Sequence, residues 1–237
     1  LTVFAGGSGY TAGVGITSGT RNTAVGPSAL DVATSGDDNT AIGANALGAV
    51  TTSSDNTAVG SYAGAAITTG ANNTAVGYTA LDANTTGHSN TVVGAAAGTA
   101  VTTGINNVAI GYTALASATT AADNVIVGKQ AGFNITDSQY NVGVGNNAIQ
   151  TLTTGDRNVA VGHSAMYALT TASDNIAIGN ETGVAITTGA ENVLIGSYAG
   201  DAITTGASNI ATGYNALGSV TTASYNVGIG QSAGGAI

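Results

Sequence analysis

Few side chains in this sequence could act as a catalytic acid, base or nucleophile. The chain of 237 residues contains two histidines, His88 and His163, and no cysteine. Serine and aspartate are plentiful, but a hydrolytic triad needs a histidine base beside them. The two histidines occupy different positions of the repeat described below, five repeats apart, so they cannot share a metal ion or a proton. We therefore predict no catalytic residue and no enzymatic activity.

Two short glycine motifs are similar to part of a dinucleotide-binding loop, Gly143-Val144-Gly145 and Gly228-Ile229-Gly230. Such a loop binds a pyrophosphate only where it joins a strand to the start of a helix. Neither motif is followed by a helical pattern, so we predict no bound cofactor.

Three aspartates have the chemistry of a cation site. Asp37, Asp38 and Asp55 occupy one corner of adjacent repeats, and carboxylate oxygens are the ligands that Ca²⁺ prefers. Arg21 lies one repeat before Asp38, which favours the alternative of a solvated corner with exposed ion pairs. We favour the solvated corner and keep the Ca²⁺ site as the alternative.

Tyrosines offer a second kind of surface. Tyr78, Tyr112 and Tyr214 fall at position +5 of the repeat, with Tyr62 and Tyr198 at the next position, +6. Exposed aromatic rings at such a spacing suit a sugar-binding surface. The alternative is that the rings partly cover apolar surface at a corner of the fold.

A repeat of 17 residues must position all of these side chains. Asparagine recurs every 17 residues from Asn22 to Asn226, with no insertion or deletion. With Asn as position 0, position +4 is glycine and position +12 is threonine throughout these repeats. We expect the three columns to form structural ladders, which begin with Asn22, Asn39, Asn56 and Asn73, with Gly26, Gly43, Gly60 and Gly77, and with Thr34, Thr51, Thr68 and Thr85.

A short and invariant period is typical of a solenoid. The repeat is rich in β-branched residues, glycine and asparagine and poor in strong helix formers, which favours strands. We predict an all-β parallel β-solenoid or β-roll of about 14 coils over residues 1–237. Residues 5–21 form a degenerate first repeat, 22–225 twelve regular repeats and 226–237 a partial last repeat. We also expect the chain to be a segment of a longer protein.

Within each coil we predict strands at +1 to +3, +6 to +8 and +10 to +13. The glycine at +4 should need a positive φ, and the asparagine and threonine columns should form hydrogen-bonded ladders. Position +8 is small where +11 is large, as in Gly64 with Ile67 and Leu30 with Ala33. This compensation of volume predicts that +8 and +11 are in contact.

The strand at +1 to +3 should present alternate residues to opposite faces. Position +3 is Val or Ile in nearly every repeat, so we predict that +3 points inward. Position +2, mostly alanine from Ala24 to Ala211, would then form an exposed stripe. Such a stripe favours a subunit interface, most simply that of a homotrimer.

Charge excludes several partners. The formal net charge is −9, and only three residues are Lys or Arg. We therefore expect no nucleic-acid binding, and no long apolar segment predicts membrane insertion. Arg21 and Arg157 each lie one repeat before an aspartate, Asp38 and Asp174, which predicts exposed ion pairs.

The repeat N-T-A-V-G-Y-T-A-L-D-A-N-T-T-G at 73–87 resembles repeats of tail-fibre-domain proteins of bacteriophages and bacteria. Its A-V/I-G core is similar to the head repeats of trimeric autotransporter adhesins, whose unit is shorter. The resemblance implies a trimeric β-roll fibre that is extracellular and lies on a virion or cell surface. It also implies a receptor-binding tip elsewhere in the chain, with host-surface glycans or other fibre proteins as partners.

The function that we predict is the shaft of a trimeric extracellular or viral fibre. The alternative is a surface-binding solenoid, either a glycan adhesin or an ice-binding protein. The ice-binding alternative depends on threonines at +12 and +13, and on those at +1 from Thr23 to Thr91.

Overall fold

The computed structural model describes residues 2–3 and 18–235. It contains two compact units, Leu1–Ala122 (unit 1) and Asp123–Ile237 (unit 2), and each is described by itself. Residues 4–17, with most of the predicted degenerate repeat 5–21, lie outside the described residues, as do 1, 236 and 237. In the described part of the chain, no helix is long and apolar enough to cross a bilayer.

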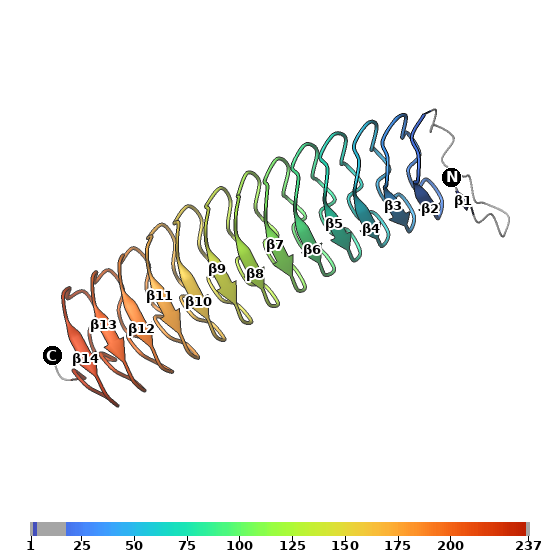
Figure 1. The fold of residues 1–237 in the computed structure, drawn as a ribbon. Coiled ribbons are helices and arrows are strands. Elements are labelled where there is room, and N and C mark those ends of the chain that lie inside the picture. Colours follow the sequence, from blue (N-terminus) through green and yellow to red (C-terminus); the bar gives the residue numbers. More distant parts are fainter. Residues whose placement is uncertain (1, 4–17, 236–237) are drawn as a thin grey trace. The chain divides into compact units, whose positions relative to one another are not determined.

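Each unit is a stack of coils, and each described coil contributes one short strand (Figure 1). In unit 1 the strands are β1 (Thr2–Val3), β2 (Thr23–Val25), β3 (Thr40–Ile42), β4 (Thr57–Val59), β5 (Thr74–Val76), β6 (Thr91–Val93) and β7 (Val108–Ile110). In unit 2 they are β8 (Val125–Val127), β9 (Val142–Val144), β10 (Val159–Val161), β11 (Ile176–Ile178), β12 (Val193–Ile195), β13 (Ile210–Thr212) and β14 (Val227–Ile229). Consecutive strands within a unit pair in parallel, so the predicted all-β parallel solenoid is confirmed.

The strand register follows the sequence period. Thr40 of β3 pairs with Thr57 of β4, and Ile176 of β11 pairs with Val193 of β12, a shift of 17 residues in each case. Strand β1 differs, because Thr2 pairs with Thr23, a shift of 21. The pairing of β1 with β2 therefore does not follow the 17-residue frame.

The prediction of three strands per coil is wrong for the described coils, because only +1 to +3 is extended. Positions +6 and +8 take a positive φ in successive coils, as in Tyr62 (φ 59°) and Leu47 (φ 48°). A strand needs consecutive residues with an extended backbone and a negative φ, so the positive φ at +6 and at +8 prevents a strand there. The backbone there still pairs between coils, since Leu47 N–H donates to the Ala63 carbonyl at 3.0 Å.

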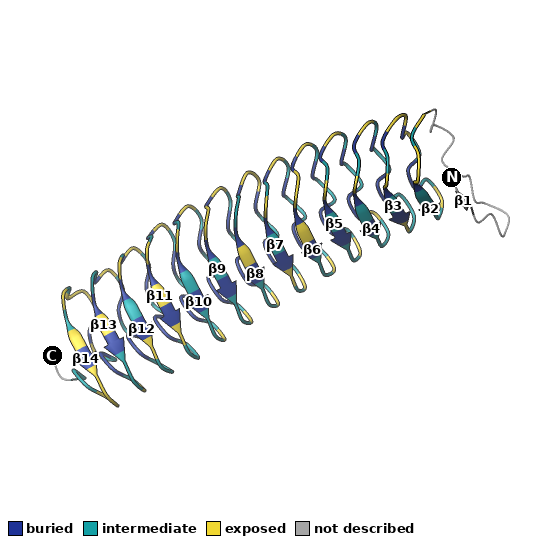
Figure 2. Cartoon of the chain, viewed as in Figure 1, coloured by how far each residue is buried: buried dark blue, intermediate teal, exposed yellow. Residues whose placement is uncertain are grey.

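The predicted direction of the strand faces is also wrong. Position +2 is buried: Ala41 and Ala177 have no exposed surface, while Ile42 and Ile178 at +3 are each 40% exposed. Figure 2 shows the buried residues within the strands (dark blue) beside more exposed ones. The alanine column therefore lies in the core and is no subunit interface. The +1 and +3 side chains form the outer face of each unit.

The core explains why +2 must point inward. A Cβ on Gly132 (+8) would lie 3.1 Å from Cγ2 of Ile126 (+2) and 2.8 Å from Cδ1 of Ile135 (+11). The predicted contact between +8 and +11 is thus confirmed, with +2 as its third member. Large +2 residues occur where +8 is glycine, as in Val92 with Gly98 and Leu194 with Gly200. That correlation was the sequence signal for an inward +2 column.

Candidate functional site

Asparagine side chains connect successive coils through the core of each unit. The Asn90 side-chain oxygen accepts from Asn107 backbone N–H at 3.0 Å and from Asn107 Nδ2 at 3.1 Å. Asn90 Nδ2 donates to the Asn73 side-chain oxygen (3.1 Å) and to the Gly104 carbonyl (2.8 Å). Asn192 repeats the same bonds in unit 2. The predicted amide ladder is confirmed and is a structural device.

The glycine and threonine columns have structural roles as well. Gly77 has φ +136°, and a Cβ there would lie 2.5 Å from the Gly94 carbonyl oxygen of the next coil. Thr68 Oγ1 donates to the Thr85 carbonyl oxygen at 3.0 Å. The threonine ladder therefore forms from hydroxyl to backbone rather than from hydroxyl to hydroxyl. The +12 hydroxyl protons are therefore used in hydrogen bonds to backbone carbonyls within the solenoid.

The acidic corner of unit 1 is a set of separate hydrogen-bonded carboxylates. Asp37 accepts from the backbone N–H (2.6 Å) and hydroxyl (2.7 Å) of Thr20, and Arg21 binds both oxygens of Asp38 at 2.6 Å. These hydrogen bonds lower the pKa of both carboxyls below its usual value. No three acidic or histidine side chains in the described ranges gather as metal ligands, and Asp55 donates its backbone N–H to the Asp37 carbonyl at 3.1 Å.

The predicted ion pairs are confirmed in both units. Arg157 donates to both oxygens of Asp174 at 2.7 and 2.8 Å, as Arg21 does to Asp38. The hydrogen bond from Arg157 is the main cause of a lowered pKa at Asp174. Because all four side chains are largely exposed, solvent screens the pairs and each adds little to stability.

The outer face consists of β-branched residues alone. Its +3 column is Val or Ile in every described coil except Thr212, and it carries no charge. The +1 column differs between the units. It is Thr23, Thr40, Thr57, Thr74, Thr91 and Val108 in unit 1, and Val125, Val142, Val159, Ile176, Val193, Ile210 and Val227 in unit 2.

The three tyrosines predicted as surface contacts are exposed but do not gather. Tyr78 is 62% exposed, Tyr112 56% and Tyr214 55%. Tyr78 and Tyr112 are separated by a whole coil of unit 1, in which Ala95 takes their position. Tyr214 instead forms an edge-to-face contact with Tyr198, with ring centroids 5.7 Å apart. A sugar-binding surface formed by these tyrosines stays a prediction.

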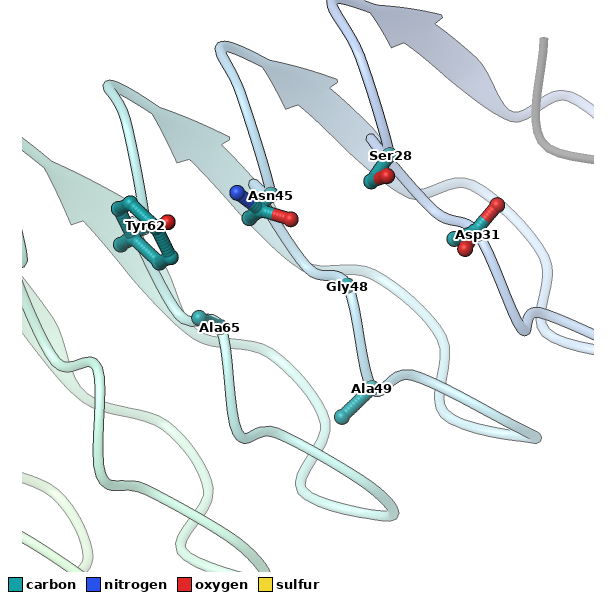
Figure 3. A pocket seen from close by; sticks show the side chains of 7 residues that line it. All are labelled: Ser28, Asp31, Asn45, Gly48, Ala49, Tyr62 and Ala65. Carbon is teal, nitrogen blue, oxygen red and sulfur yellow. The ribbon is translucent and has the colours of Figure 1, made fainter. Parts of the chain in front are cut away.

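Unit 1 has a shallow groove that begins at the +6 side chains, one position after the +5 tyrosines in each coil. The groove has a volume of about 270 Å³ and crosses three coils between columns +6 and +10 (Figure 3). Gly48 leaves its floor bare, because the atoms nearest to a Cβ there are backbone atoms of Asn45 and Ser28. The groove is lined by Ser28, Asp31, Asn45, Gly48, Ala49, Tyr62 and Ala65.

Part of the groove sequence recurs in unit 2, where the floor is covered. Asn45-Ala-Leu-Gly48 has its counterpart in Asn215-Ala-Leu-Gly218. The side-chain oxygen of Asn215 fills the place that a Cβ on Gly218 would take, so that floor is covered. Burial raises the pKa of Asp201, the +9 carboxyl before Gly218, and one of its oxygens is buried without a hydrogen bond.

No family model, curated protein or solved structure matches this chain. Function is therefore inferred from the geometry of the outer face and the groove.

Proposed function

We propose that the chain is a structural shaft segment that assembles side by side with copies of itself, most simply as a parallel homotrimer. The observation that carries the proposal is the outer face, in which uncharged Val, Ile and Thr side chains repeat at every coil. Large exposed apolar patches of this kind mark interaction sites.

The period of the face favours a second copy as its partner. Rungs of a parallel sheet lie ~4.8 Å apart, and a partner with another spacing would lose register within a few rungs. A parallel copy matches every rung and places like residues together, Thr against Thr and Val against Val. Close packing of identical β-branched side chains excludes water and stabilises such interfaces.

The framework of the solenoid suits a mechanical role. Within each unit, successive coils are tied together by backbone pairing and by the amide ladder, as between Asn22 and Asn39 in unit 1 and between Asn209 and Asn226 in unit 2. The resemblance to tail-fibre repeats agrees with this role. On the basis of this resemblance, we also propose that the shaft is extracellular and lies on a virion or cell surface, where it would hold a binding tip.

The test is the solution mass of the chain by light scattering. We expect a mass near three times 22.5 kDa. Ile176→Lys combined with Ile210→Lys, two outer-face positions of unit 2 that are 37% and 42% exposed, should give a folded monomer. The matched control, Tyr140→Lys with Tyr225→Lys at exposed corners, should keep the trimer. A monomeric wild type would overturn self-assembly, and a dimer would overturn the threefold arrangement.

A second candidate function, ice binding, has one observation in its favour. The hydroxyls of Thr40, Thr57 and Thr74 lie on the outer face of unit 1 and have no hydrogen-bond partner among the described residues. Thermal hysteresis of the monomeric lysine variant, lost when these three threonines are changed to valine, would favour ice binding over a shaft.

A further inference from the structure

We propose that the groove of unit 1 is a binding subsite for one neutral pyranose ring of a glycan. This goes beyond the structural role, because a shaft needs no hollow on its side. The residues that carry the inference are Ser28, Asp31, Asn45, Gly48 and Tyr62 (Figure 3).

The groove combines an aromatic wall with polar side chains. The Tyr62 ring is 46% exposed and lies beside Asn45 of the preceding coil (Figure 3). The electron-rich face of an aromatic ring attracts the polarised C–H groups on the apolar face of a sugar. The ring therefore offers a surface on which a pyranose can stack.

The polar side chains of the groove are available to a ligand. The Ser28 hydroxyl, the Asp31 carboxylate and the Asn45 amide make no side-chain hydrogen bond to any described residue. Together they supply donors and acceptors, which neighbouring sugar hydroxyls require because each hydroxyl is both. A volume of about 270 Å³ is slightly below the roughly 300–1,000 Å³ of common ligand pockets and suits a single ring.

Charge selects the class of sugar. Asp31 is the only charged residue of the groove, and the chain carries a net charge of −9. An anionic sugar such as a sialic acid would be repelled from both. We therefore expect neutral hexoses to bind and acidic sugars to be excluded.

The counterpart in unit 2 provides an internal control. Asn215 covers the floor at Gly218, and the Tyr198 ring contacts Tyr214. The tyrosine and the asparagine also stand in the reverse order, because Tyr198 lies in the coil before Asn215 and Tyr62 in the coil after Asn45. We expect no sugar binding there.

Saturation-transfer NMR with the methyl pyranosides of glucose, galactose, mannose and N-acetylglucosamine tests the proposal on the whole chain. We expect transfer to at least one of them and none to sialic acid. Tyr62→Ala should weaken binding about tenfold through loss of the stacking surface, whereas the matched variant Tyr198→Ala should bind like the wild type.

Gly48→Tyr should abolish the signal by filling the groove. The fold tolerates aromatic residues in this column, which holds Phe133 and Tyr167 in unit 2, so circular dichroism should be unchanged. Transfer to none of the neutral sugars, or equal loss in Tyr62→Ala and Tyr198→Ala, would overturn the subsite. Binding of one free sugar needs no oligomer, so the light-scattering result and this result can fail separately.

Discussion

Units 1 and 2 share one backbone plan and differ in the side chains that it presents. Both have the asparagine ladder, the glycine corner and the same strand register. In unit 1 the +1 column is threonine in five coils and the +11 column includes Ala33, Asn84 and Ala118. In unit 2 the +1 column is Val or Ile, and the full coils from Asn124 carry only Ile, Leu or Val at +11. The ladders thus fix the fold, while inner and outer columns vary with little effect on it.

The largest effect should come from breaking the part that the units share. Asn90→Ala removes the acceptor of Asn107 N–H and the side-chain donor to the Gly104 carbonyl. It also removes one of the two acceptors of Asn107 Nδ2, which keeps the Ala121 carbonyl. Asn192→Ala does the same in unit 2, where Asn209 Nδ2 keeps the Ala223 carbonyl. Each buried polar group that loses its hydrogen-bond partner costs about 1–3 kcal/mol. Each variant should therefore lose about 3–5 kcal/mol of unfolding free energy, measured by urea denaturation. Asn147→Ala, an asparagine outside the ladder, is the control. Unequal losses at 90 and 192 would show that the frameworks differ.

The next effect concerns the outer face. Val142→Thr with Val159→Thr makes two coils of unit 2 resemble unit 1. If copies bury this face, two hydroxyls per chain enter an apolar interface, and association should weaken by about 2–4 kcal/mol as measured by sedimentation equilibrium. The stability of the isolated coil should change little, since the side chains are isosteric. Thr57→Val with Thr74→Val should act in the opposite direction. Unchanged association in both would argue against the outer face as the interface.

The sequence predicted the repeat, the parallel solenoid and the amide ladder, because each depends on a column of one residue type. It predicted the corner ion pairs because opposite charges, such as Arg21 and Asp38, lie one repeat apart in the same column. The predicted direction of the strand faces is wrong, because β-branched Val and Ile usually point into a core and small alanine does not mark one. The core is filled by +8 and +11, which leave room only for alanine at +2 where +8 is leucine, as in Leu47 with Ala41. The left-handed +6 and +8 positions, and with them the groove, were not predictable from residues such as Leu and Tyr, which rarely take a positive φ.

A smaller effect should come from making the core of unit 1 resemble that of unit 2. Both side-chain polar atoms of Asn84 are buried without a hydrogen bond. Valine occupies the same column at Val50, where +8 is also leucine, so Asn84→Val should fit. We expect a gain of about 1–2 kcal/mol in urea unfolding, because the desolvation penalty of the amide is removed. Val50→Asn is the reverse control, and a loss of stability in Asn84→Val would mean that the amide is satisfied.

The smallest effect compares two aspartates of unit 2 through pH. Burial raises the pKa of Asp201, so the folded state holds its proton more tightly than the unfolded state. Stability should therefore fall as the pH rises above the ordinary value near 3.8 and through the raised folded pKa, and the ionised carboxylate is a cost at pH 7. Asp201→Asn should gain less than about 1 kcal/mol of stability at pH 7, since solvent screens the partly exposed carboxylate, and nothing at pH 3. Asp174→Asn should behave in the opposite sense, since Arg157 lowers the pKa of Asp174 and the stability from that pair is present above 3.8 and lost as the pH falls. Thermal unfolding at pH 3 and pH 7 measures both differences, and equal signs for the two variants would contradict burial as the cause at Asp201.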